Sequence, residues 1–133
     1  MVPSRYGNKE TGAQGEDIAC LYLQSKGYRI VGRNYRRRTG EIDIIAEKGA
    51  IVHIVEVKAG TYLSRENISR EKASWDPAEH ATAEKLQKVA RTALLYMAEH
   101  NDSRQYQVDV LAVYLDLQRK RAICVLFEQV LGD

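Results

Sequence analysis

The residues best suited to chemistry interrupt the most apolar and β-branched stretch of the chain, GEIDIIAEKGAIVHIVEVKAG at residues 40–60. They are Glu41, Asp43, Glu56 and Lys58. Carboxylates this close repel each other, and without a compensating cation one of them should keep its proton. Mg²⁺ or Mn²⁺ would remove the conflict, because these ions bind carboxylate oxygens and leave positions for water and substrate phosphate. Asp43 and Glu56 are the natural pair of ligands.

Lys58 would act beside that metal. It lies two residues after Glu56, so both side chains point to the same face of a strand. Its ammonium would approach an attacking water or a phosphorane oxygen and stabilise the negative charge that develops in the transition state. Alternatively, the charged residues form only an exposed face of the sheet, with cross-strand ion pairs worth about 0.2–1 kcal/mol each.

A hairpin would bring the four charged residues together. With a two-residue loop at Lys48 and Gly49, residue 43 faces residue 54 and residue 41 faces residue 56. Because side chains alternate along a strand, the charged residues then share one face. The other face would carry Ile42, Ile44, Ala46, Ile51, His53, Val55 and Val57.

A predicted helix ahead of the strands supplies one more carboxylate. The segment from Thr11 to Gln14 has the form of a capping box, so a helix should follow it. Glu16 precedes Ala19 by three residues and Leu23 by seven, and therefore shares the face expected to pack on the sheet. Glu16 would assist as a metal ligand or as a base. The alternative is an acidic residue that only stabilises the positive end of the helix dipole.

Arginines crowd just before the acidic strands. Arg36, Arg37 and Arg38 suit a patch that contacts the phosphate backbone of DNA. A solvated loop, or charges that protect an edge strand, would give the same pattern.

The hydrophobic pattern predicts the order α-β-β-β-α-β-β in one domain, residues 1–133. Residues 1–10 are expected to form a flexible arm and residues 61–77 a long loop. The strongest helix signal covers residues 78–100, and two final strands are predicted at 107–116 and 121–130. A helix between strands indicates a crossover and some parallel pairing, hence an α/β fold with a mixed sheet flanked by helices.

Composition excludes several classes of protein. No apolar run approaches the roughly 20 residues that a membrane span needs, and the first residues lack the apolar core of a secretory signal. The net charge of +2 indicates little by itself. Cys20 and Cys124 are the only cysteines and lie among apolar neighbours, so we expect reduced core thiols in a cytoplasmic protein.

Five segments of the chain form a recognisable set. They are GEDIACLYLQSKGYRIVGRNYR, GEIDIIA, VEVKA, EKLQKVARTALLYM and VDVLAV. Together they resemble the uncharacterised bacterial family UPF0102, the YraN-like proteins, from Gly15 to Val113, most of the chain. The sequence departs from the family at two places: Ala59 and Gly60 follow VEVK where a basic residue is usual, and residues 106–110 read YQVDV, with Asp109 retained.

The family resembles the PD-(D/E)XK nuclease superfamily, and archaeal Holliday-junction resolvases in particular. This implies a restriction-endonuclease-like fold and a Mg²⁺-dependent phosphodiesterase site. Glu16 matches the helix glutamate of that site, Asp43 its strand aspartate, and Glu56 with Lys58 its Glu-x-Lys pair. Lys85 matches a basic position on the long helix that would meet the DNA backbone, although an ordinary exposed helix lysine would look the same.

These observations favour a metal-dependent endonuclease that acts on the phosphodiester bonds of branched or otherwise structured DNA. A homodimer would suit a two-fold junction, by analogy alone. Two other classes remain open. One is a nucleic-acid binding module that keeps the fold without turnover, and the other is a protein-interaction domain that docks through residues 61–77.

Overall fold

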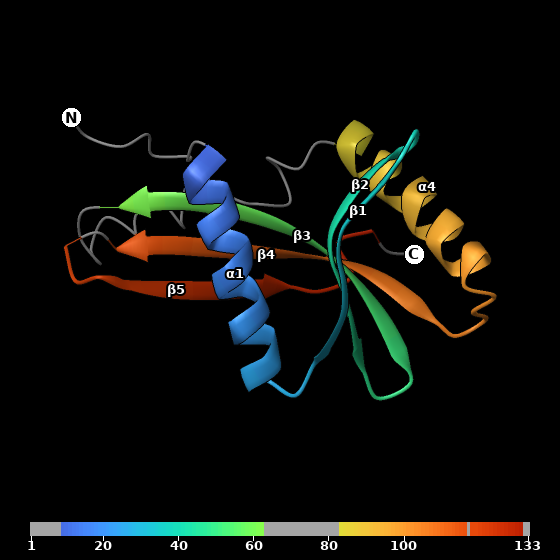
Figure 1. The fold of residues 1–133 in the computed structure, drawn as a ribbon, viewed down its shortest axis with the longest axis horizontal. Coiled ribbons are helices and arrows are strands. Elements are labelled where there is room, and N and C mark those ends of the chain that lie inside the picture. Colours follow the sequence, from blue (N-terminus) through green and yellow to red (C-terminus); the bar gives the residue numbers. More distant parts are fainter. Residues whose placement is uncertain (1–8, 63–82, 117, 132–133) are drawn as a thin grey trace.

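The computed structural model describes residues 9–62, 83–116 and 118–131. In these ranges, two helices flank a five-stranded mixed sheet, in the order α-β-β-β-α-β-β that the sequence predicts (Figure 1). The architecture is α/β and is consistent with a restriction-endonuclease-like fold. The elements are α1 (Lys9–Ser25), β1 (Arg29–Arg37), β2 (Gly40–Lys48), β3 (Ile51–Tyr62), α4 (Ala83–Glu99), β4 (Tyr106–Asp116) and β5 (Arg121–Phe127).

The sheet is an antiparallel meander joined to a parallel pair. The strand order is β1-β2-β3-β4-β5, and only β3 and β4 run parallel. Parallel neighbours need a crossover connection, and α4 lies in the segment that links them. In Figure 1, α1 crosses β3, β4 and β5, whereas α4 lies beside the ribbon formed by β1 and β2.

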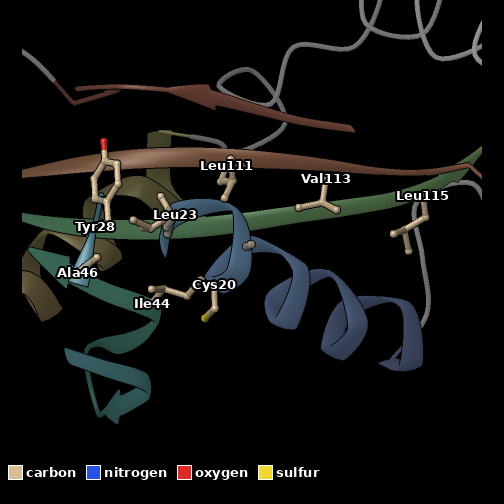
Figure 2. Close-up of a cluster of buried hydrophobic side chains, with 10 residues drawn as sticks. Cys20, Leu23, Tyr28, Ile44, Ala46, Leu111, Val113 and Leu115 are labelled. Atoms are coloured by element: carbon tan, nitrogen blue, oxygen red, sulfur yellow. The ribbon is translucent and has the colours of Figure 1, made fainter. Parts of the chain in front are cut away.

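Each helix packs on its own hydrophobic cluster. On the α1 side, Ala19 and Leu23 are fully buried against residues of β2, β3 and β4 (Figure 2). On the α4 side, Val89 and Ala93 pack against Ile54 and other residues of β2 and β3. The strand β4 is buried at every position after its first. A helix therefore covers each face of the sheet.

The hairpin of β2 and β3 has a different turn from the one expected. Lys48 pairs with Ile51, so the loop is Gly49 and Ala50 and not Lys48 and Gly49. The φ angle of Gly49 is +61°, which fits a turn whose first central residue is glycine. The register moves by two residues, and residue 54 pairs with Ile45 where residue 43 was expected.

Strict alternation along β2 also fails. Ile44 packs in the α1 cluster, but Ile42 packs in the α4 cluster, although both were expected on one face. The ladder between β2 and β3 ends at the pair of Ile44 and Val55. The two strands thus diverge just where Asp43 stands, and the strand rotates between its two isoleucines.

Three boundaries differ from the expectation, one of them being that of β5, which ends at Phe127 and not at residue 130. The helix α1 begins at Lys9, ahead of the proposed capping box and within the expected 1–10 arm. The strand β3 continues to Tyr62 and takes the first two residues of the expected 61–77 loop. The remainder of that loop, residues 1–8 of the arm and residues 78–82 of the predicted helix lie outside the described residues.

Both cysteines are free thiols. Cys20 is buried and Cys124 is half-buried, and both belong to the core on the α1 side. Among the described helices, none is long and apolar enough to cross a membrane.

Candidate functional site

Asp43 stands at the divergence of β2 and β3. Its Oδ2 atom accepts a hydrogen bond from the backbone N–H of Val57, over 2.8 Å. The carboxylate thus binds a donor of β3 just beyond the end of the backbone ladder. Strand separation opens room for a side chain here, and the hydrogen bond fixes where that side chain lies.

Glu56 and Lys58 extend from β3 beside Asp43. The Nζ atom of Lys58 lies 3.4 Å from Oε1 of Glu56, and their side chains are 22% and 19% exposed, respectively. An ion pair this poorly solvated is screened less than one on the open surface. The lysine therefore holds positive charge at the edge of a carboxylate pair.

The two carboxylates are electrostatically strained. Burial, and then the nearby charges of Glu56, Glu16 and Glu41, together raise the pKa of the Asp43 carboxyl to about 7, against the lowering effect of the Val57 N–H. Burial also raises the pKa of Glu56, while Lys58 lowers it. A divalent cation with a preference for oxygen ligands would relieve both groups at once. The donor set consequently fits Mg²⁺ or Mn²⁺.

Glu16 reaches this region because α1 comes very close to β3. A Cβ atom on Gly15 would lie 2.5 Å from the Cβ of Ala59, which no side chain tolerates. Only glycine permits this approach, and Glu16 follows it directly. The Glu16 side chain is 21% exposed, and burial raises its pKa while the charge of Arg33 lowers it.

Asn34 links the two outer carboxylates of the cluster. In the amide orientation that satisfies both groups, its nitrogen donates to Oε1 of Glu16 over 3.1 Å and to Oε1 of Glu41 over 3.2 Å. Asn34 has a φ of +53°, a left-handed conformation that asparagine adopts more readily than most residues. Glu16, Asn34 and Arg33 line a surface cleft between α1 and β1.

The three predicted backbone-binding arginines have different surroundings. Arg36 donates to Glu41 over 3.1 Å. Arg37 makes two hydrogen bonds of 3.0 Å to the carboxylate of Glu99 on α4, and its guanidinium lies over the ring of Tyr35. Arg38 is exposed. Arg37 is thus held by α4, and Arg36 is bound to the acidic cluster.

Lys85 lies in the first turns of α4, on its exposed surface. Its charge contributes to lowering the pKa of Glu56. The structure therefore gathers Glu16, Asp43, Glu56 and Lys58, with Lys85 nearby, from four different elements.

Sequence reasoning missed one buried polar group. Nδ1 of His53 lies 2.7 Å from Oδ2 of Asp109, and both side chains are buried. The Oδ1 atom of Asp109 accepts hydrogen bonds from Nε2 of Gln107 and from the backbone of Gln129. Glu128 adds a third possible metal ligand atom. Because donors already satisfy both oxygens of Asp109, we interpret the buried hydrogen-bonded group as a structural link between β3, β4 and the C-terminal segment. In the sequence, only the retention of Asp109 in the YQVDV segment pointed to this group.

The chain belongs to the uncharacterised protein family UPF0102, whose model matches residues 15–113. Curated relatives share its length as well. A UPF0102 protein of Sulfurovum is 38% identical over 84% of this chain and 86% of the relative, and one of Campylobacter lari is 36% identical over 79% and 84%. One of Helicobacter hepaticus is 32% identical over 92% and 96%.

Among solved structures, SfsA of Pyrococcus furiosus in complex with Ca²⁺ matches at a TM-score of 0.34 and 16% identity, over 95% of this chain and 64% of that one. A likeness this weak relates neither the sites nor the activities of the two proteins.

Proposed function

We propose that this protein is a Mg²⁺-dependent endonuclease that hydrolyses phosphodiester bonds of DNA. One observation carries the proposal: two poorly exposed carboxylates lie together, the charge of Glu56 raises the pKa of Asp43, and the ammonium of Lys58 lies only 3.4 Å from Glu56. A structural surface does not need carboxylates packed in this way, whereas a cation and phosphate site does.

Each residue of the candidate site has a role that follows from its chemistry. Asp43 and Glu56 would hold Mg²⁺ or Mn²⁺, with Glu16 as a further ligand or as the base. The ion would supply Lewis acidity toward a phosphate oxygen. Lys58 orients the attacking water and stabilises the charge that develops on the phosphate oxygens. The hydrogen bond from Val57 holds Asp43 in place for this task.

Arg36, Arg38 and Lys85 would grip the phosphate backbone, and Arg37 would contribute through its placement of the β1–β2 turn on α4. We propose branched or structured DNA as the substrate, with a homodimer matching a two-fold junction by analogy. The free thiols Cys20 and Cys124 suit a cytoplasmic location, where thiols stay reduced.

Cleavage of labelled DNA tests the proposal. Wild type is incubated with duplex, single-stranded and four-way-junction DNA in Mg²⁺, Mn²⁺ or EDTA, beside Asp43→Asn and Lys58→Gln. Glu47→Gln is the matched control, because Glu47 lies on the same strand but pairs with Arg29 and Arg104. We expect metal-dependent cleavage by wild type and by the control, and a loss of about 100-fold or more in the two site variants.

Equal cleavage by all four proteins would refute this site. DNA binding without cleavage by any of them would favour a nucleic-acid binding module without turnover. Failure to bind DNA at low salt would favour a protein-interaction domain.

A further inference from the structure

The turn between β1 and β2 docks on α4. Oγ1 of Thr39 lies 2.7 Å from Oγ1 of Thr92, and Thr92 also donates to the backbone carbonyl of Lys88 over 2.9 Å. Gly40, with a φ of +149°, permits this contact: a Cβ there would lie 3.2 Å from Oγ1 of Thr92 and 3.5 Å from Cβ of Lys88. The turn and this part of α4 thus form one continuous surface.

That surface carries a row of positive charge. Lys85, Lys88 and Arg91 recur every three residues on α4 and are all exposed. Lys88 adjoins Gly40, and Thr92, one turn later, holds the docked tip. Arg38 lies next to Thr39 in the turn that follows β1 and is exposed too. The row therefore runs along α4 beside the tip of the hairpin.

The row lies beside the strand that carries Asp43. Lys88 adjoins Gly40, the first residue of β2, and the charge of Lys85 lowers the pKa of Glu56. From Lys85 to Arg91 the helix advances roughly 9 Å, at about 1.5 Å per residue. One DNA strand presents a phosphate about every 3.4 Å along the duplex axis. The spacing thus suits two or three consecutive phosphates beside the reacting one.

Lys88 and Arg91 differ from two arginines of β1. Arg33 and Arg37 each pair with a carboxylate. Within the described residues, no acidic side chain forms an ion pair with Lys88 or Arg91. Exposed cations aligned in this way favour a polyanionic partner.

We propose that Lys88 and Arg91, together with Lys85 and the docked tip around Arg38, bind the phosphate backbone of duplex DNA next to the cleaved bond. This rests on the proposed function and adds two contact residues that the motifs did not indicate. It also assigns Arg37 to fixing the tip on α4, through Glu99, rather than to gripping the DNA.

Fluorescence anisotropy with labelled duplex DNA tests the proposal, with Ca²⁺ in place of Mg²⁺ and salt varied between titrations. The variant K88Q/R91Q removes both charges but keeps residues with good helix propensity. The control is K120N/R121Q, which removes two exposed charges at the opposite edge of the sheet. Asparagine is chosen at position 120 because Lys120 has a φ of +51°.

We expect the salt slope, log K against log [salt], to be shallower by about 2 in K88Q/R91Q than in wild type, because each lost phosphate contact contributes about 0.9. The control should keep the slope of wild type. An unchanged slope in K88Q/R91Q, or the same loss in both variants, would overturn the proposal.

The cleavage assay separates the two proposals. If wild type cleaves DNA and K88Q/R91Q keeps its salt slope, the backbone contact is wrong and the endonuclease stands. If wild type neither binds nor cleaves DNA, both fail.

Discussion

The carboxylate of Asp43 on β2 accepts the backbone N–H of Val57 on β3, at the place where the ladder between these strands ends. A group proposed to bind metal is therefore also part of the pairing of two central strands. Its state of ionisation acts on the stability of the fold as well as on cation binding.

Replacing Asp43 by Asn should stabilise the metal-free protein at pH 8. The folded-state pKa of about 7 lies above the ordinary value of 3.8, so ionisation of Asp43 costs stability as pH rises from about 4 to 7, and the full cost remains above pH 7. At about 1.4 kcal/mol per pH unit, the gain from Asn approaches roughly 4 kcal/mol at pH 8 and is much smaller at pH 5. Urea unfolding in EDTA at both pH values measures it.

Glu47→Gln is the control, because its effect on stability at pH 8 should have the opposite sign. Hydrogen bonds from Arg104 and Arg29 lower the pKa of Glu47, so its charge contributes stability above pH 4.5 that is lost as pH falls. This variant should lose stability at pH 8. Added Mg²⁺ should stabilise wild type and Glu47→Gln but not Asp43→Asn. A destabilised Asp43→Asn at pH 8 would contradict the strain inferred for this carboxylate.

Lys58→Gln should strongly slow turnover while DNA binding persists. The ammonium is one charge among several that face the backbone, but it is the one beside Glu56. We expect kcat to fall about 100- to 1000-fold, as when one donor to a developing oxyanion is removed, with Kd changed only slightly. Single-turnover cleavage and anisotropy on the same DNA measure the two effects. A large change in Kd with kcat unchanged would make Lys58 a binding residue only.

Gly15→Ala should move α1 away from β3. The added Cβ would lie 2.5 Å from the Cβ of Ala59, an overlap that we expect to cost about 1–3 kcal/mol. The change should also lower metal-dependent cleavage, because Glu16 moves with the helix. Combining it with Ala59→Gly should recover part of the stability, because the opposing Cβ is gone. Strictly additive losses in a double-mutant cycle would show that the two residues do not press on each other.

Asn34→Asp should destabilise the protein more at pH 8 than at pH 5. The new carboxylate would face Glu16 and Glu41, where the amide now donates to both. Asn34→Gly is the matched control, because it removes the amide without strain at a φ of +53°. We expect about 1 kcal/mol of loss in the glycine variant and a greater one in the aspartate variant, measured by chemical unfolding at both pH values. Equal losses at both pH values would contradict the bridge.

Asp109→Asn should reduce stability without changing the metal requirement of cleavage. The fully buried carboxylate accepts from Gln107 and Gln129 and lies 2.7 Å from His53. The Asn side chain would place its N–H₂ group where donors now face a carboxylate oxygen, which should lower the free energy of unfolding by about 1–3 kcal/mol. Thermal unfolding and a Mg²⁺ titration of cleavage check this prediction. A changed Mg²⁺ dependence would give Asp109 a part in metal binding.

Most of the fold could be predicted because the hydrophobic pattern is local. The order of elements and the mixed sheet followed from runs of apolar residues and from one helix between strands. The sequence could not place the turn, since Lys48-Gly49 and Gly49-Ala50 both offer a two-residue loop. The choice depends on whether Gly49, with its positive φ, is the first or the second residue of that loop. The opposite packing of Ile42 and Ile44 depends on strand divergence, which no pattern along one strand records.

The candidate site shows the same division. Residue types and spacing indicated Asp43, Glu56, Lys58 and Glu16. Their surroundings were not accessible from the sequence, because Glu99 holds Arg37 from a distant helix and Asn34 bridges carboxylates of two other elements. The docking of Gly40 on α4 brings the β1–β2 turn beside the row of basic residues, and it is likewise a contact between distant segments.

The parts of the candidate site differ in how much chain entropy is lost when folding brings them together. Asp43 and Glu56 belong to one antiparallel hairpin with a two-residue loop, so little chain has to be closed to bring them together. The parallel pairing of β3 with β4, by contrast, joins Val52 to the distant Tyr106 and imposes a high contact order on the rest of the sheet. The carboxylate pair is thus the part of the site most readily transferred to a designed hairpin, whereas Glu16 and Lys85 are placed only by the complete fold.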